Sequence, residues 1–308
     1  MSKLPIMIDT DPGIDDAAAL AIALFHPDLD VKLITTVAGN VSIEKTTANA
    51  LKLIEMFGKD VPIARGCEHP LVYDLDDGSE VHGITGMDGW VFPEPDYSRL
   101  MKEHAVIAMR DLLMESPEEI TLVAIGPLTN VGMLFRLFPE VKAKINEIVL
   151  MGGSVTRGNK TPTGEFNIYS DPEAAHIVFT SGLPIRMVGL DVGWKSFVDG
   201  KHMDMLPEIN KVCEMLEATF RHYRSNQFEK GIVNMYDSDA IAALVKPEMF
   251  KWVNTHLDVE LEGKYGRGQT VCDLDERYGK AHNVTVAVDV STKVFQDWFI
   301  ESLKNCNI

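Results

Sequence analysis

The chain has 308 residues, of which 45% are hydrophobic, and it carries a formal net charge of −17 at pH 7. This length and apolar content suffice for a substantial buried core, and we expect residues 1–308 to form a single domain. The negative charge argues against binding to nucleic acid or to an anionic membrane, because both partners require a basic protein face. It leaves room for a small neutral ligand.

The cysteines and the apolar runs indicate a cytoplasmic protein. No run approaches the ~20 apolar residues that a membrane span requires, and the N-terminal residues lead into a strand pattern without the apolar core of a signal peptide. The cysteines are widely spaced and include no Cys-x-x-Cys pair, which is typical of reduced thiols. They are Cys67, Cys213, Cys272 and Cys306.

Apolar strand patterns alternate with helical patterns through the first two-thirds of the chain. This alternation predicts an α/β fold with an open, mostly parallel Rossmann-like sheet and helices on both faces. Near-continuous apolar strands also fit a sheet that is covered on both sides. The expected strands are 4–9, 31–38, 61–64, 120–125, 147–151 and 184–190, and the expected helices are 15–26, 43–57, 100–115, 127–137 and 171–181.

The last third of the chain has a different pattern, which predicts extra C-terminal helices and strands. A long amphipathic helix is expected over 203–229, a shorter helix is expected to start near Asp237, and a closing helix is expected at 292–304. Alternating residues in 255–261 indicate an edge strand or hairpin with one wet face. The two strands expected here are 253–262 and 283–290.

Three aspartates crowd into one short segment after the first expected strand. Asp11, Asp15 and Asp16 lie in the run Asp-Thr-Asp-Pro-Gly-Ile-Asp-Asp at 9–16, just before a helical pattern. So many anions repel one another unless a positive group joins them, and a hard divalent cation bound through oxygen is the simplest answer. Because open α/β sheets bind ligands at the carboxyl ends of their strands, we expect this segment to form the floor of an active site.

Polar residues also follow other expected strands. Asn40 follows the strand at 31–38, and Met151 ends the strand at 147–151. A single such residue is usually turn chemistry, but several together with the aspartates favour a shared site. Asp237, from the far end of the chain, is either the cap of the helix that it precedes or the residue that completes the cation site.

Two long loops, 65–97 and 152–170, contain further candidates. His82 lies in a glycine-rich run that could bring backbone and imidazole near a ligand, although an ordinary loop histidine is the alternative. Asn159, Glu165 and Asn167 could grip vicinal hydroxyl groups through amide and carboxylate groups, or could belong to a solvated loop. Loops of this length are usually functional or disordered.

Together, these motifs resemble those of the inosine–uridine-preferring nucleoside hydrolases. The run at 9–16 resembles the N-terminal signature of that family, and the resemblance extends in consistent order over nearly the whole chain. It continues through 37–40, 82–89, 126–130, 151–153 and 165–168.

The resemblance implies a homodimeric or homotetrameric enzyme that hydrolyses the N-glycosidic bond of ribonucleosides to ribose and free base. Asp11 would be the base that activates a water molecule. The implied cofactor is Ca²⁺, held by Asp11, Asp15, Asp16, the backbone carbonyl of Ile125 and Asp237. The implied ribose pocket consists of Asn40, Met151, Asn159, Glu165 and Asn167.

One position departs from the family pattern. Tyr236 stands where well-known members carry a histidine that is associated with protonating the departing purine. Tyrosine is a weaker acid at neutral pH but can still donate a hydrogen bond, and His82 or a water molecule could assist the leaving base instead. The loop at 82–89 resembles that of pyrimidine-preferring bacterial members, which predicts a slight preference for uridine and cytidine.

Two other functions fit parts of the sequence. A magnesium-dependent phosphohydrolase of the haloacid dehalogenase type also begins with strand-borne aspartates, but it needs downstream basic and hydroxyl residues for the phosphoryl group, and no persuasive motif supplies them. A calcium-dependent nucleoside- or ribose-binding protein, with catalysis lost through Tyr236, is the other alternative. The presence of Asp11 argues against it, because a pure binder would not need a water-activating base.

Overall fold

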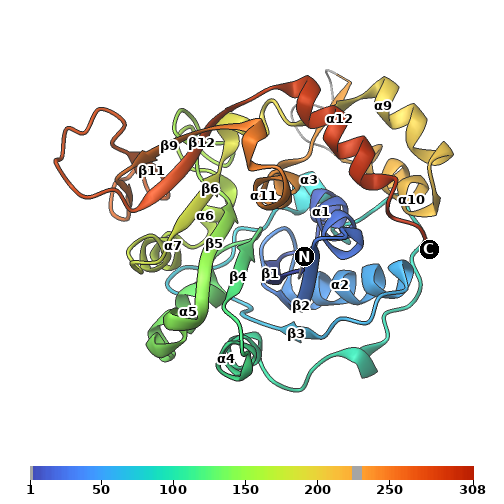
Figure 1. Ribbon diagram of the computed structural model, residues 1–308, viewed down its shortest axis with the longest axis horizontal. Coiled ribbons are helices and arrows are strands. Elements are labelled where there is room, and N and C mark those ends of the chain that lie inside the picture. The colour runs from blue at the N-terminus through green and yellow to red at the C-terminus, as the bar shows by residue number, and fades with distance from the viewer. Residues whose placement is uncertain (1–2, 224–230) are drawn as a thin grey trace.

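The computed structural model describes residues 3–223 and 231–308 and centres on an eight-stranded sheet (Figure 1). The strand order is β3-β2-β1-β4-β5-β6-β12-β9, with parallel pairing throughout except for β9, which pairs antiparallel to β12 at one edge. The expected open, mostly parallel sheet is therefore confirmed. Its strands are β1 (Leu4–Thr10), β2 (Leu29–Thr36), β3 (Ile63–Arg65), β4 (Ile120–Ala124), β5 (Ile145–Met151), β6 (Ile185–Val188), β9 (Phe250–Thr255) and β12 (Val284–Val290).

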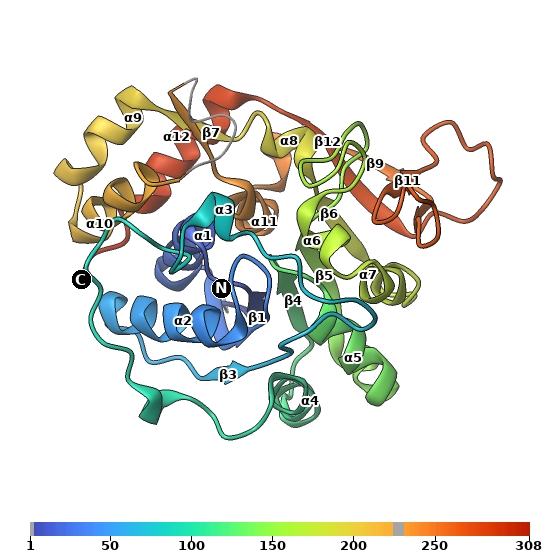
Figure 2. The same cartoon turned by 180° about the vertical axis from the view of Figure 1, so that it is seen from behind.

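Helices cover both faces of this sheet, as the buried apolar strands require. Figures 1 and 2 show the two groups on opposite sides, and each group packs into its own cluster of buried apolar side chains. One face carries α1 (Ile14–Phe25), α2 (Ile43–Phe57), α10 (Lys211–Phe220), α11 (Tyr236–Val245) and α12 (Thr292–Leu303), and the other carries α4 (Ala105–Glu115), α5 (Thr129–Leu137) and α7 (Pro172–Phe179).

The prediction of one long helix over 203–229 is wrong. The chain instead forms α9 (Gly200–Met205), a 3-10 turn at Leu206–Glu208 and then the separate helix α10. Pro207 cannot donate a backbone hydrogen bond, and the Oδ1 atom of Asn210 accepts from the Cys213 amide at 2.9 Å to cap a new helix. The part of the expected helix at 224–229 lies outside the described residues.

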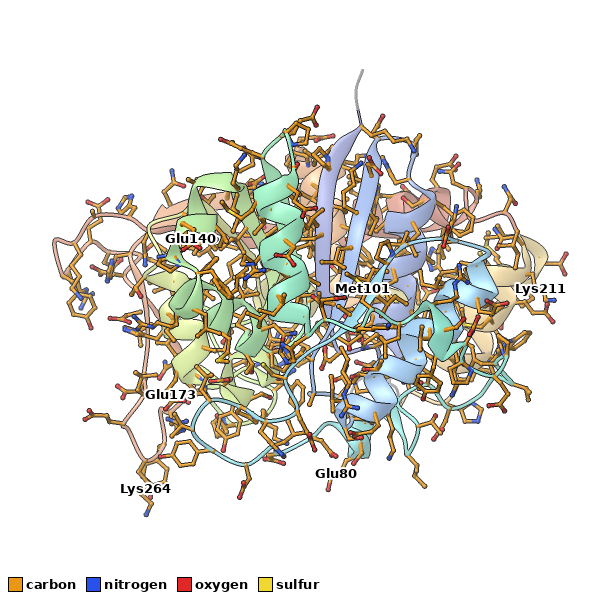
Figure 3. The ribbon with its side chains drawn as sticks, turned by 90° about the horizontal axis from the view of Figure 1, so that it is seen from below. Glu80, Met101, Glu140, Glu173, Lys211 and Lys264 are labelled. Atoms are coloured by element: carbon orange, nitrogen blue, oxygen red, sulfur yellow. The ribbon has the colours of Figure 1, made fainter. Side chains whose placement is uncertain are left out.

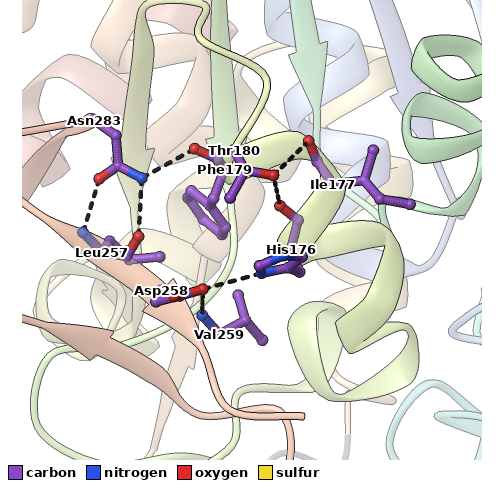
Figure 4. Close-up of polar contacts among 8 residues, drawn as sticks. All are labelled: His176, Ile177, Phe179, Thr180, Leu257, Asp258, Val259 and Asn283. Carbon is purple, nitrogen blue, oxygen red and sulfur yellow. Dashed lines mark hydrogen bonds and ion pairs between the residues drawn. The ribbon is translucent and has the colours of Figure 1, made fainter.

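The strand expected over 253–262 is two strands in different sheets. After β9, the short strand β10 (Leu257–Val259) pairs antiparallel with β11 (Thr270–Cys272), which agrees with the alternating pattern of a hairpin. The hairpin belongs to a lobe that projects from the sheet in Figure 1. Figure 4 shows how it is attached. Asp258 contacts His176 of α7 at 3.0 Å, and the side-chain Nδ2 atom of Asn283 donates to the backbone carbonyls of Phe179 and Leu257.

Several short helices and strands were not expected from the sequence, because none has a periodic pattern long enough to detect. The strand β7 (Phe197–Asp199) pairs antiparallel with β8 (Ile232–Asn234). The one-turn helices α3 (Ser79–His82), α6 (Phe166–Ser170) and α8 (Leu190–Gly193) lie in or beside the loops that follow the strands.

The parallel strands end at one edge of the sheet, where the long loops gather. In Figure 3 the strand β1 begins at the upper edge of the molecule, and Glu80 of α3 lies at the lower edge. Within residues 3–223 and 231–308, no helix is long and apolar enough to cross a membrane.

Candidate active site

A cavity of about 360 Å³ opens at the carboxyl edge of the sheet. All of the residues proposed from the sequence for catalysis, substrate binding or metal binding line this cavity, except Asp11 and Asp16, which lie in its buried floor. Residues that sequence reasoning missed also line it. They are Asp77, Gly78, Glu80, Val81, Lys160, Phe166, Trp194 and Tyr223.

Three carboxylates meet at the base of the cavity. Asp15 and Asp16 lie in the first turn of α1, and Asp237 lies in the first turn of α11, more than two hundred residues later. One carboxylate oxygen from each lies within 4.8 Å of the others, and all three side chains are buried. The distant Asp237 therefore does join the N-terminal aspartates, as one of the two readings of its sequence context required.

Burial and mutual repulsion disfavour the charged form of the carboxylates in this cluster. Burial raises the pKa of Asp11, Asp15 and Asp237 well above the ordinary range, and neighbouring carboxylates raise it further. None of the ion pairs found among residues 3–223 and 231–308 involves these aspartates or Asp16. An all-oxygen donor set without a cationic partner fits a hard divalent cation.

Asp11 has one anchored oxygen and one unengaged oxygen. Its Oδ2 atom accepts a hydrogen bond from the backbone amide of Asn40 at 2.7 Å, whereas its buried Oδ1 atom has no partner among the described residues. Gly39 and Gly126 approach the carboxylate so closely that a Cβ atom on either would collide with it. The two strand ends thus fit around Asp11, and its Oδ1 atom is available to accept a proton or to bind a cation.

Asn40 supports the acidic floor as well as lining the cavity. Its Nδ2 atom donates to the Asp11 carbonyl at 3.1 Å and to Asp16 Oδ2 at 3.0 Å. Asp16 also accepts from the Thr10 hydroxyl at 2.6 Å and from the Gly13 amide at 2.9 Å. Asp16 is thereby fixed in orientation, although sequence reasoning assigned Asn40 to the ribose alone.

Glu165 and Asn167 are held in place at the start of α6. Glu165 accepts from the backbone amides of Gly153, Asn167 and Ile168 at 2.8–3.1 Å, and burial raises its pKa to about 7. Asn167 donates from Nδ2 to the Ile125 carbonyl at 3.2 Å and to the Met151 carbonyl at 3.1 Å. These contacts fix polar side chains on the cavity wall above the carboxylates.

Asn159 lies at the exposed rim of the same wall. Its Oδ1 atom accepts from the Phe166 amide at 2.9 Å, which leaves its Nδ2 donor group directed elsewhere. The nearby Lys160 pairs with Asp76 at 2.8 Å and so connects the two long loops across the cavity mouth. The length of these loops was the only sequence signal for this contact.

His82 is a neutral donor in this structure. Its Nδ1 atom accepts from the Ile14 amide at 3.2 Å, which places the ring proton on Nε2. Burial lowers its pKa to about 3, so the ring stays uncharged at neutral pH. It packs edge-to-face on Tyr223 with ring centroids 5.2 Å apart. His82 can therefore donate a hydrogen bond, but it is not a positively charged imidazolium at neutral pH.

Tyr236 is also a protonated donor. Burial raises its pKa above the ordinary value, and the carboxylates of Asp15 and Glu165 add to the shift, while Arg157 opposes it. Its ring lies edge-to-face with Trp194 at a centroid distance of 5.8 Å. Together with Tyr223, these rings form the aromatic part of the cavity lining, which is called the aromatic wall below. No local sequence pattern marks Trp194 as part of the cavity, although it lines it.

Comparison with known proteins assigns this chain to one family. The model of the inosine-uridine preferring nucleoside hydrolase family matches residues 6–297. A non-specific ribonucleoside hydrolase, RihC, from Escherichia coli O127:H6 is 50% identical over 301 residues, which is 98% of each chain.

Solved structures agree with the sequence match. A purine-preferring ribonucleoside hydrolase from Gardnerella vaginalis superposes with a TM-score of 0.91 at 28% identity and covers 98% of each chain. The plant nucleoside hydrolase PpNRh1 superposes with a TM-score of 0.90 at 30% identity, covering 98% of this chain and 99% of its own. These matches exclude the phosphohydrolase alternative. The chain belongs to the inosine–uridine-preferring nucleoside hydrolases, enzymes that hydrolyse the N-glycosyl bond of ribonucleosides.

Proposed function

We propose that the protein is a calcium-dependent hydrolase that converts ribonucleosides to ribose and free base. The observation that supports this most strongly is the buried cluster of Asp15, Asp16 and Asp237 at the base of the cavity, with the free oxygen of Asp11 beside it. These donors, with the carbonyl of Ile125, would hold the cation. A divalent cation there would supply Lewis-acid chemistry that acidifies water and polarises sugar hydroxyl groups.

In this proposal, Asp11 is the general base. Its Oδ2 atom is fixed by the Asn40 amide, so the carboxylate cannot rotate away, and its Oδ1 atom takes a proton from the attacking water. Because the base is held in one orientation before substrate arrives, little reorganisation is needed during the reaction.

The ribose would lie between the acidic floor and the α6 wall. Asn40, Met151, Asn159, Glu165 and Asn167 line this part of the cavity and supply amide and carboxylate groups for the sugar hydroxyls. The anionic groups also favour the positive charge that develops on the sugar ring as the glycosidic bond breaks. A deoxyribose substrate would leave some of these groups unpaired and should react poorly.

His82 and Tyr236 would donate hydrogen bonds to the departing base. Both line the cavity and both carry a proton at neutral pH, for the reasons given above. We propose acceptance of both purine and pyrimidine nucleosides, with uridine and cytidine cleaved slightly faster. The resemblance of the His82 loop to that of pyrimidine-preferring members supports this preference, whereas the relatives matched here include non-specific and purine-preferring enzymes.

An assay of reducing sugar tests the proposal directly. Purified protein with added Ca²⁺ should release ribose from uridine, cytidine, inosine and adenosine, and much less from deoxyuridine. The pyrimidine nucleosides should react up to a few-fold faster. If nucleosides bind but no ribose is released, the protein is the calcium-dependent binding protein considered above.

Three further properties belong to the same proposal. We expect one folded domain over residues 1–308, a cytoplasmic location and a homodimer or homotetramer. Light scattering after size-exclusion chromatography would test the oligomeric state, and a single cooperative unfolding transition would support one domain.

A further inference from the structure

Arg157 lies behind the aromatic wall of the cavity. It is an exposed residue of the loop at 152–170, and its guanidinium carbon lies 4.4 Å from the centroid of the Trp194 ring. Trp194 lines the cavity and lies edge-to-face with Tyr236, with an interplanar angle of 87°. The three side chains therefore form a row that runs from the surface to the cavity, with the positive charge at its outer end.

Hydrogen bonds hold this row in place. The Val155 amide and the Thr156 hydroxyl, just before Arg157, both donate to the carboxylate of Asp191 at 2.6 and 2.7 Å. Asp191 belongs to α8, and Trp194 directly follows that helix. The short helix α8 thus binds the loop that carries Arg157 and also positions Trp194, whose ring the guanidinium of Arg157 contacts.

The inner end of the row, at Tyr236, is closely packed against the backbone of α8. A Cβ atom on Gly193 would collide with the ring of Tyr236, so the backbone of α8 is in direct contact with that ring. A cation over one face of an indole is attracted by the ring's negative face, and this contact is typical of arginine. In this structure the guanidinium of Arg157 therefore lies against the face of the Trp194 indole.

The reaction creates negative charge on the leaving base. As the C1′–N bond breaks, its electron pair stays on the base nitrogen and a water oxygen bonds to C1′. The proton that the water loses balances the proton that the base gains. Until that proton arrives, the base carries excess negative charge, in a cavity whose floor is already acidic. A positive charge at the aromatic wall stabilises this charge.

We propose that Arg157 is a specificity-determining positioning residue: seated on Trp194, it keeps the aromatic wall electropositive and favours departure of bases that are poor leaving groups. This inference rests on the proposed nucleoside hydrolysis. Arg157 does not line the cavity, so it acts on the leaving group through the wall and not by contact.

The proposal requires that the effect of Arg157 depend on the leaving group. The test compares uridine with p-nitrophenyl β-D-ribofuranoside, whose p-nitrophenolate departs as a stable anion without help. Arg157→Met removes the charge but keeps much of the apolar length. Arg157→Lys keeps the charge. Arg136→Met, an exposed arginine at the end of α5, is the matched control.

For Arg157→Met, kcat for uridine should fall about threefold to tenfold, less than the loss of a donor in direct contact with developing charge, because water screens the exposed guanidinium. For the p-nitrophenyl substrate, kcat should fall less than about threefold, because p-nitrophenolate needs little stabilisation of its charge as it leaves. Arg157→Lys should recover much of the uridine rate, and Arg136→Met should match the wild type on both substrates.

Equal losses on both substrates, or no loss on either, would overturn the proposal, and so would failure of Arg157→Lys to recover more activity than Arg157→Met. An error in the proposed function itself looks different, because the wild-type enzyme would then release ribose from neither substrate. The melting temperature of each variant separates a folding defect from an electrostatic one.

Discussion

The floor and the aromatic wall of the cavity are built by different kinds of contact. Asp11 and Asn40 follow the adjacent strands β1 and β2, Asp16 lies in the first turn of α1, and hydrogen bonds of 2.7–3.1 Å join the three residues. On the wall, Trp194 and Tyr236 meet through ring contacts with centroids 5.8 Å apart. The floor is thus fixed by directional bonds to the backbone, and the wall by side-chain contact.

This difference separates two tasks. Directional hydrogen bonds keep catalytic groups within the narrow geometry that bond breaking requires. Ring contacts tolerate a change of residue more easily, because they depend on shape and not on a donor–acceptor pair. We therefore expect changes in the floor to affect all nucleosides alike, and changes in the wall to alter the order of preference among bases.

The largest effect should come from the floor. Asp11→Asn keeps the shape of the side chain and an oxygen for the backbone amide of Asn40, but it removes the proposed general base. We expect kcat to fall about a thousandfold for every nucleoside, the central range for loss of a general base. Steady-state kinetics on uridine and inosine would measure this. Near-normal turnover, or a loss confined to one base, would remove Asp11 as the base and weaken the division between floor and wall.

Removal of the proposed metal should also act through the floor alone. Chelation with EDTA should abolish turnover of all nucleosides and lower the melting temperature, because the buried carboxylates then repel one another. A ligand at about 100 times its Kd contributes about 2.7 kcal/mol, so a loss of roughly 5 °C is expected for a chain of this size. Calcium-saturated EDTA is the control. An unchanged melting temperature after chelation would argue against a cation in the cluster.

The floor was predictable from the sequence because its signal is local. The run at 9–16 concentrates its aspartates beside a strand pattern and a helix pattern, and both patterns were correct to within a few residues. Parallel strands bring their carboxyl ends together, so Asn40 and Met151 could be placed at the same edge without coordinates. Even Asp237, far away in the chain, was accessible through the family resemblance.

The wall was only partly predictable: Tyr236 was expected at the site, but its contact with Trp194 was not. Trp194 and Tyr236 meet only where α8 packs against α11, and Tyr223 reaches the same cavity from beyond the end of α10; no periodic pattern marks these contacts. The error over 203–229 has a similar origin, since an amphipathic pattern continued through a proline and a capping asparagine that divide the region into two helices. Sequence patterns report periodicity, whereas the wall depends on long-range contact.

A substitution in the wall should change base preference. Tyr236→Phe removes the hydroxyl but keeps the ring against Trp194, so it should lower purine cleavage about tenfold, at the low end for loss of a proton-donating group. Pyrimidine cleavage should change less. Tyr236→His introduces a stronger acid at neutral pH and should raise the purine rate relative to uridine. An identical profile across inosine, adenosine, uridine and cytidine in all three proteins would assign Tyr236 to packing only.

The smallest effect should come from the rim. Lys160 pairs with Asp76 at 2.8 Å, and the lysine side chain is 23% exposed whereas the aspartate is 66% exposed. A pair this accessible to water stabilises by less than about 1 kcal/mol. Lys160→Met should therefore loosen the contact between the two long loops and raise KM about two- to fivefold, the range that such an energy permits, with kcat unchanged.

Lys264→Met is a suitable control, because Lys264 lies on the projecting lobe, far from Glu80 of the cavity rim in Figure 3. If Lys160 only closes the mouth, the KM values of all nucleosides should rise by the same factor, because the contact lies outside both the floor and the wall. A change in kcat would instead mean that the loops transmit their position to Asn159 and the residues that follow it. In that case the rim would belong functionally to the catalytic floor, and the division between the two regions would have to be redrawn at Asn159.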